Sequence, residues 1–179
     1  MVSAKEKAIQ SVSSSGVQFV NLQFIDIYGT IKNLTIPADQ LEGSLKDGTW
    51  FDGSSIEGFA RIHESDMYLM PDPETYAVIP WINHPKTARV ICDVYMPDRK
   101  PFEGDPRHIL KRTMAEAEKM GYTFNTGPEL EFFLFKLDGG VPKPLPQDVA
   151  GYFDYAPRDL ASAIRQEIAL ALQQFGIKV

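Results

Sequence analysis

"GPELEFFLF", residues 127–135, places two acidic residues inside one of the most apolar runs of the chain. Alternate residues of a strand share a face, so Glu129 and Glu131 lie on one side while Leu130 and Phe132 lie on the other. Phenylalanines follow on both sides, which leaves both faces largely apolar. The pattern therefore predicts a strand that is buried on both sides in a sheet.

An ionised carboxylate in a buried strand is costly unless a positive group neutralises it, and a metal cation is one such group. Same-face Cα atoms of a strand lie roughly 6.6 Å apart, and Mg²⁺–oxygen bonds are about 2.0–2.1 Å long. Glu129 and Glu131 could thus each bind a different member of a metal pair about 3.5–4 Å apart. The residues alone leave a second interpretation open, in which both glutamates protrude from a solvated strand end.

Composition predicts a soluble, cytoplasmic protein with one domain or two small ones. The 179 residues are 44% hydrophobic, and 18 Lys+Arg against 24 Asp+Glu give a formal charge of −6. No basic block is present, which argues against a nucleic-acid partner, and no apolar run approaches the roughly 20 residues of a membrane span. Cys92 is the single cysteine, so an internal disulfide and a cysteine-based zinc site are excluded.

Hydrophobic periodicity and turn residues predict the order of elements along the chain. We expect helices at 4–15, 105–121 and 158–175, and strands at 17–29, 30–38, 76–81, 86–96 and 129–135. The stretch 97–104 is rich in proline, glycine and charge and predicts a domain boundary. In the strand 86–96 the residues that share an apolar face are Ala88, Val90, Cys92, Val94 and Met96.

A second candidate site lies in "FDGSSIEGFARIHESDMYL", residues 51–69, which its glycines and serines predict to be a loop. The polar residues that crowd together in it are Asp52, Ser54, Ser55, Glu57 and Arg61. A carboxylate beside hydroxyls and aromatic rings could hold a small cation such as ammonium, or could shield a reactive intermediate from water. An ordered surface loop without a ligand is the alternative. The familiar nucleotide-binding, hydrolase and zinc-protease motifs are absent from the sequence.

The strings "FDGSSIEGFARIHESDMYLMPD" and "GPELEFFLF", in this order, resemble type I glutamine synthetase, and the resemblance runs from about residue 17 to the end. It implies an α+β fold with an N-terminal helical segment at 1–16 and a β-grasp domain at 17–100. Residues 105–179 would then be the incomplete beginning of the family's catalytic domain, an antiparallel sheet with helices that forms an open half-barrel.

The same resemblance implies an activity. The family makes glutamine from glutamate, ammonia and ATP through γ-glutamyl phosphate, with two or more Mg²⁺ or Mn²⁺ ions in a complete site. Glu129 and Glu131 match two metal ligands of the family, and Asp52 and Ser55 match the aspartate and serine that handle ammonium. Arg61 matches an arginine used by a subgroup in feedback inhibition by glutamine.

The resemblance also implies a homo-oligomer, a dodecamer, in which the Asp52 loop reaches the active site of a neighbouring subunit. The family's remaining metal ligands and most of its ATP contacts correspond to positions beyond residue 179, so we expect the 179-residue chain alone to be inactive. Two alternatives stay open: a non-catalytic interaction or regulatory fragment, and a related ligase that joins glutamate to another amine. Leu130 stands where the family commonly has proline.

Overall fold

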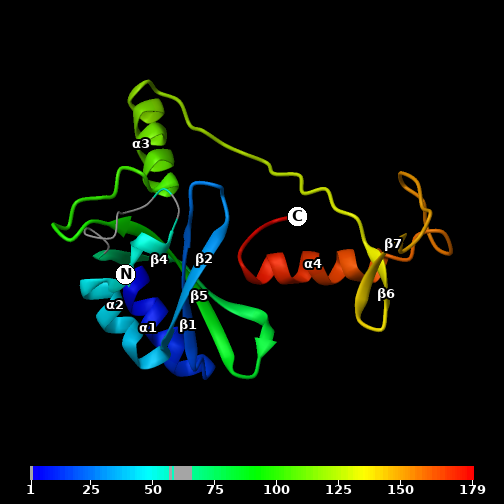
Figure 1. The fold of residues 1–179 in the computed structure, drawn as a ribbon, viewed down its shortest axis with the longest axis horizontal. Helices are drawn as coiled ribbons and strands as arrows, with labels where there is room; N and C mark the ends of the chain where they lie inside the picture. The colour runs from blue at the N-terminus through cyan, green and yellow to red at the C-terminus, as the bar shows by residue number, and fades with distance from the viewer. Residues whose placement is uncertain (1, 57, 59–65) are drawn as a thin grey trace. The chain divides into compact units, whose positions relative to one another are not determined.

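A computed structural model describes residues 2–56, 58 and 66–179 of the chain (Figure 1). Contacts between residues divide the chain into two units, Met1–Phe124 and Asn125–Val179. Each unit is described by itself below. In the part of the chain that the structure describes, no helix is long and apolar enough to cross a membrane.

A five-stranded mixed sheet in the order β2-β1-β5-β4-β3 forms the centre of the first unit. β1 pairs antiparallel with β2 and parallel with β5, and β4 pairs antiparallel with both β5 and β3. The strand bounds are β1 Phe19–Ile25, β2 Ile31–Pro37, β3 Thr49–Asp52, β4 Asp66–Asn83 and β5 Lys86–Tyr95. This mixed sheet with helices confirms the predicted α+β class.

Two helices, α1 (Ala4–Ser15) and α2 (Leu41–Asp47), pack against β4 and against each other (Figure 1). Ser3 caps α1 in a reciprocal capping box with Glu6, and Gly16 ends the helix in the left-handed conformation at φ 67°. The 3₁₀ turn Ala38–Gln40 leads into α2. The sequence predicts α1 and the hairpin of β1 and β2 but did not predict α2.

The alternation predicted for β5 is confirmed, because its apolar face lines the core of the first unit. Ala88, Val90, Cys92 and Val94 are buried, and β1 adds Val20, Leu22 and Phe24 from the neighbouring position in the sheet. Burying an aliphatic or aromatic side chain of this size stabilises the fold by about 1.5–3 kcal/mol. Burial also raises the pKa of the Cys92 thiol, which makes this cysteine an inert core residue.

The helix α3 (Pro106–Lys119) begins where the sequence predicts, with Asp105 as its N-cap and Pro106 as its first residue. Asp105 is fully buried and accepts hydrogen bonds from the amides of Arg107 and Val94, each at 3.0 Å. Its burial raises the pKa of the Asp105 carboxyl. The cap thus ties the start of α3 to β5.

Arg107 strengthens this attachment through an ion pair with each of two strands. Its guanidinium donates to Asp72 on β4 at 2.6 Å and to Asp93 on β5 at 2.7 Å, and Lys111 lies 2.7 Å from the Asp93 carboxylate. Contacts therefore group α3 with the sheet, although the composition change at 97–104 precedes this helix. The domain limits at residues 100 and 105 stay a prediction.

Replacing Arg107 by alanine is expected to lower the free energy of unfolding of the first unit by about 2 kcal/mol. The loss leaves the partly buried Asp72 and Asp93 with Lys111 as their remaining cationic neighbour in the described structure. Urea unfolding of the 179-residue chain and amide exchange in α3 measure the effect. Arg112→Ala is the matched control, because Arg112 and its partner Glu103 are both exposed and their pair contributes little. Equal losses in the two variants would contradict the proposed attachment.

The second unit contains a short hairpin and one helix among its described elements: β6 (Phe135–Asp138), β7 (Val141–Pro146) and α4 (Ser162–Gln174). Most of its side chains are exposed, and the cis peptide Ala156–Pro157 lies between the hairpin and α4. α4 begins four residues later than predicted. Asp159, just before α4, instead accepts the Ala161 amide at 2.9 Å. The half-barrel predicted for the complete catalytic domain stays a prediction, because the described part of this unit contains only one hairpin.

The strand predicted at 129–135 is wrong for this structure. Residues 121–134 form no helix or strand, and only Phe135 belongs to β6. Leu130 and Phe133 are each 80% exposed, where the alternating pattern predicts burial on both faces. A strand needs partner strands for its backbone groups, and no described strand pairs with residues 129–134.

Candidate functional site

Asp52 is the last residue of β3, the edge strand beside β4, and lies on the exposed side of that strand. The preceding Phe51 points to the opposite side, where its ring lies 5.1 Å from that of Phe24 in the core. Alternation therefore turns Trp50 and Asp52 outward together. The sequence predicts a loop here, but residues 49–52 are a strand, and this strand is what fixes the direction of the Asp52 side chain.

The turn that follows β3 holds the Asp52 carboxylate in place. Gly53–Ser55 form a single 3₁₀ turn, and Asp52 Oδ1 accepts the Ser54 amide at 2.8 Å. Hydrogen bonds from the Ser54 hydroxyl and then from the Ser54 amide hold the pKa of Asp52 below its ordinary value. Gly53 is buried and Ile56 packs against the core, so the turn is anchored while Asp52 and Ser55 are exposed.

Asp66, the first residue of β4, lies directly opposite Asp52 in the register of the two strands. Residues opposite each other in an antiparallel pair have Cβ atoms about 4.5–5.5 Å apart, so two acidic side chains start from neighbouring positions at this edge. Such a pair attracts a small cation. The sequence analysis did not single out Asp66, although Asp66 lies within the quoted loop motif. Recognising it requires the register of β3 against β4.

A stack of three side chains continues from the two aspartates along the same face. The centroids of the Trp50 and Tyr68 rings lie 3.6 Å apart, and the guanidinium carbon of Arg99 lies 3.6 Å from the centroid of the Tyr68 ring. Arg99 adopts φ 66°, and its Nη1 donates to the Asp47 carbonyl at 2.5 Å. Tyr68 is buried beneath this cover, whereas Trp50 remains 51% exposed beside Asp52.

Two residues of the predicted loop, Glu57 and Arg61, lie outside the described residues. The feedback role that the resemblance implies for Arg61 stays a prediction. Ser55 ends the 3₁₀ turn that follows Asp52, and its side chain is exposed. Its predicted role beside Asp52 stays a prediction.

Glu129 and Glu131 are both exposed in the unpaired segment of the second unit. Across the described residues no three acidic, histidine or cysteine side chains come together as a metal site. Carboxylate oxygens are nonetheless the ligands that Mg²⁺ and Mn²⁺ prefer. The two glutamates thus offer the type of ligand that a hard divalent ion prefers, and they would supply part of its coordination shell.

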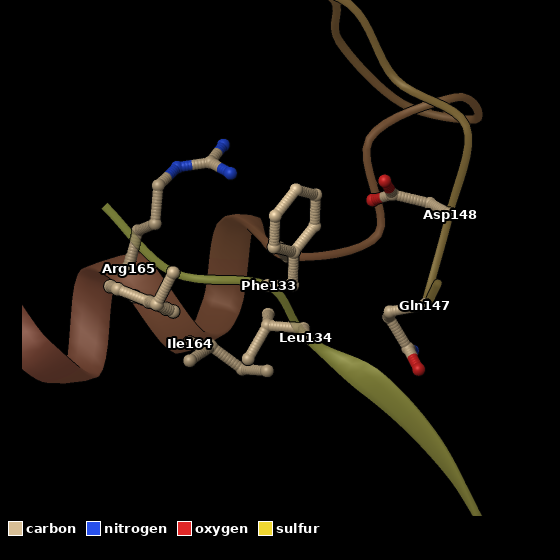
Figure 2. A pocket seen from close by; sticks show the side chains of 8 residues that line it. Phe133, Leu134, Gln147, Asp148, Ile164 and Arg165 are labelled. Atoms are coloured by element: carbon tan, nitrogen blue, oxygen red, sulfur yellow. The ribbon is translucent and has the colours of Figure 1, made fainter. Parts of the chain in front are cut away.

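The second unit also contains a pocket at the start of α4, which does not include either glutamate. Figure 2 shows Phe133, Leu134 and Ile164 gathered between Arg165 on one side and Gln147 and Asp148 on the other. Arg165 is paired with Asp159, so its charge is already matched. The pocket is mainly apolar and does not correspond to either candidate site.

Two family models match the chain in succession. The model described as the glutamine synthetase β-grasp domain matches residues 16–97, and the model described as the glutamine synthetase catalytic domain matches residues 103–179.

Curated relatives named glutamine synthetase match nearly the whole chain. The protein of Clostridium saccharobutylicum is 52% identical over 177 residues, which cover 98% of this chain and 40% of the relative. That of Thermotoga maritima is 54% identical over 170 residues, 94% of this chain and 39% of the relative. The chain thus spans about two fifths of the length of the curated relatives it matches.

Solved structures share the fold. Apo GmaS without ligand matches 98% of this chain and 40% of its own at a TM-score of 0.73 and 22% identity. Plasmodium falciparum glutamine synthetase matches 99% of this chain and 41% of its own at a TM-score of 0.73 and 18% identity. A structure titled GmaS/ADP complex is 25% identical over 67% of this chain and 26% of its own, with a TM-score of 0.59.

Proposed function

Because the chain belongs to the glutamine synthetase family, to whose N-terminal portion it corresponds, we propose that the protein containing it forms glutamine from glutamate, ammonia and ATP. ATP phosphorylates the side-chain carboxylate of glutamate, and ammonia then attacks the carbonyl carbon of the acyl phosphate. Inorganic phosphate leaves, and the new C–N bond gives glutamine. This reaction makes the protein an ATP-dependent ligase.

Asp52 is the residue of this chain that we place at the ammonia step. Its ionised carboxylate would bind ammonium through a charge-assisted hydrogen bond and then accept the proton that ammonium must lose before it can attack. The observation that carries this assignment is the exposed Asp52 carboxylate at the end of β3, opposite Asp66 in the strand register, with hydrogen bonds from Ser54 that hold its pKa below the ordinary value. Ser55 would add a hydroxyl beside the bound cation.

Glu129 and Glu131 would hold two divalent ions, Mg²⁺ or Mn²⁺, together with ligands from the rest of a complete protein. When bound, such ions balance the negative charge of the phosphates. The family's use of ATP and divalent metal supports this role, and so do the oxygen ligands that these residues offer. The solved GmaS/ADP complex supports a nucleotide site in the fold.

A homo-oligomer fits the exposed Trp50 and the position of Asp52 on an edge strand. We propose that the Asp52 loop reaches the active site of a neighbouring subunit, as the dodecameric arrangement of the family implies, and that Arg61 serves feedback inhibition. A cytoplasmic location agrees with the use of ATP and glutamate.

Two other functions remain candidates. The acceptor could be an amine other than ammonia, in which case Asp52 would bind an alkylammonium group. The second candidate is a non-catalytic interaction or regulatory role for residues 1–179, and the graft described below tests it.

The test uses a grafted enzyme, in which residues 1–179 replace the matching part of the Clostridium saccharobutylicum protein. The grafted enzyme is expected to form glutamine. Asp52→Asn in it is expected to lower kcat/KM for ammonium about 100-fold and to leave the KM values for glutamate and ATP near those of the parent.

Asp39→Asn is the matched control, because Asp39 is exposed on the turn before α2, away from β3. Unchanged ammonium kinetics in Asp52→Asn would remove Asp52 from the reaction. Methylamine preferred over ammonium by the parent graft would favour the related ligase, and a graft without any ligase activity would favour the non-catalytic role.

A further inference from the structure

We propose that Arg99 is a positioning residue for the ammonia step, and that its side chain clamps β3, the strand that carries Asp52, against β4. Arg99 lies in the turn between β5 and α3. The inference rests on the proposed function of Asp52, and it assigns a role to a residue outside both candidate sites of the sequence analysis.

Backbone hydrogen bonds fix the turn that carries Arg99. The Arg99 amide donates to the Met96 carbonyl at 2.9 Å, and the Met96 amide donates to the Lys100 carbonyl at 2.8 Å. The Phe102 amide then donates to the Val94 carbonyl at 2.9 Å, which returns the chain alongside β5. The φ of 66° at Arg99 is a left-handed conformation that glycine adopts more easily than any residue with a Cβ. The Arg99 side chain therefore starts from a defined position beyond the end of β5.

From this turn the Arg99 side chain reaches both the start of β3 and the neighbouring part of β4. Its Nη1 donates at 2.5 Å to the carbonyl of Asp47, two residues before β3 begins, and lies 3.9 Å from Met70 Sδ on β4. Its guanidinium carbon lies 3.6 Å from the centroid of the Tyr68 ring, also on β4. One planar, permanently charged group thus joins the backbone before β3 to two side chains of β4.

The backbone that Arg99 holds is itself tightly packed on β4. Gly48 lies between Asp47 and β3, and its φ is 76°. A Cβ built on Gly48 would lie 2.5 Å from Met70 Sδ and 3.3 Å from a carbon of the Tyr68 ring. The backbone before β3 therefore rests directly on the same two side chains that Arg99 contacts.

The position of Asp52 depends on this packing because β3 is a short edge strand. Its four residues pair with β4, and β4 is its neighbour in the sheet. Trp50 lies opposite Tyr68 in the register and packs on the same Tyr68 ring that Arg99 contacts. Asp52 is the next residue of β3 on the side to which Trp50 points, so a shift of β3 along β4 moves both side chains together. Arg99 thus sets the position of Asp52 without touching a substrate.

The first measurement uses steady-state kinetics of the grafted enzyme with Arg99→Gly. Glycine relieves the left-handed backbone and removes the side chain, so a role of Arg99 in the turn alone predicts unchanged ammonium kinetics. The clamp instead predicts that kcat/KM for ammonium falls about fivefold, mainly through KM, while the KM values for glutamate and ATP stay near those of the parent. A fivefold change corresponds to about 1 kcal/mol, the scale of an exposed cation–π contact. Parent-like ammonium kinetics would overturn the proposal.

Two further variants separate the Arg99 side chain from the turn. Arg99→Lys keeps a cation for the Tyr68 ring but lacks the planar fork that also reaches the Asp47 carbonyl, so its kcat/KM is expected to lie between those of the parent and Arg99→Gly. Lys100→Ala is the matched control, because Lys100 belongs to the same turn and its ion pair with Asp98 is exposed. An equal loss in Lys100→Ala would mean that any change in the turn has this effect, and would overturn the role of Arg99.

The second measurement observes the clamp in the 179-residue chain without catalysis. The sequence has two tryptophans, so the substitution Trp81→Phe, at an exposed position, leaves Trp50 as the single reporter. In this background Arg99→Gly is expected to weaken the near-ultraviolet circular dichroism of the Trp50–Tyr68 pair and to increase quenching of Trp50 fluorescence by acrylamide. Lys100→Ala is expected to change neither signal. Parent-like signals in Arg99→Gly would show that Arg99 does not hold the pair.

The two levels of the proposal fail in different ways. A neutral Arg99→Gly beside an impaired Asp52→Asn would reject this inference alone. A neutral Asp52→Asn would reject the proposed function of Asp52 and the positioning role of Arg99 with it.

Discussion

Replacing Glu129 or Glu131 by alanine in the grafted enzyme is expected to lower the rate of glutamine formation about 1,000-fold, with loss of the ordinary response to Mg²⁺. Each proposed ligand contributes to a metal ion that supplies several kcal/mol of stabilisation to a phosphoryl-transfer transition state. Because both side chains are exposed in the chain, their removal is expected to change the free energy of unfolding by less than about 0.5 kcal/mol. The predicted effect is therefore on catalysis and not on folding.

Titrations of activity with Mg²⁺ and with Mn²⁺ measure this effect in the two single variants and the double variant. If the two glutamates serve the same metal centre, the double variant should lose little more than either single variant. Glu118→Ala is the matched control, because Glu118 is an exposed glutamate on α3 with no assigned role. Parent-like metal titrations in both single variants would show that neither glutamate is a ligand.

The sheet core could be predicted from the sequence because its signals are local. A period of two places Val90, Cys92 and Val94 on one face wherever the strand runs, and burial of that face follows. The start of α3 is equally local, since Asp105 and Pro106 determine the first turn by themselves. Such features need no knowledge of partners distant in the sequence.

The rest of the first unit depends on pairings that no local pattern reveals. Pro71 and Pro73 argue against a continuous strand because proline lacks an amide donor, yet β4 runs through both and shifts its register after Asp72. The pairing of β3 with β4 places Asp66 opposite Asp52, and a loop assignment for 51–69 hides this relation. The sequence therefore predicts Asp52 as a site residue but does not reveal Asp66, the carboxylate opposite it.

The segment containing Glu129 and Glu131 shows the opposite failure. Its alternating pattern of residues is typical of a strand. The pattern indicates which side chains a strand would bury, but a strand also needs partner strands for its backbone hydrogen bonds, and the pattern does not supply them. Among the described residues, those neighbours are absent, and the segment is extended and exposed. The sequence therefore identifies the two proposed metal ligands, but the described structure does not place them in a sheet.

The 179-residue chain alone is expected to form no glutamine and to show strong amide protection in the first unit only. Strands β1, β4 and β5 surround the buried core, and α3 is included through Asp105 and Arg107. The second unit places few side chains in a core, and its exposed apolar residues include Phe133, Tyr152 and Phe153. Slow exchange requires buried, paired backbone groups, so protection should fall after Phe124.

Two measurements on the purified chain decide this prediction: an assay of glutamine formation dependent on ATP and ammonium, and amide exchange across both units. The grafted enzyme is the positive control for the assay, since it carries the same 179 residues within a protein of the relatives' length. Two exposed glutamates leave most of the near-octahedral oxygen shell of Mg²⁺ to water, so we expect the lone chain to bind the ion only weakly. Turnover by the lone chain, or protection after Phe124 equal to that in β5, would mean that residues 125–179 build a functional catalytic unit without further strands.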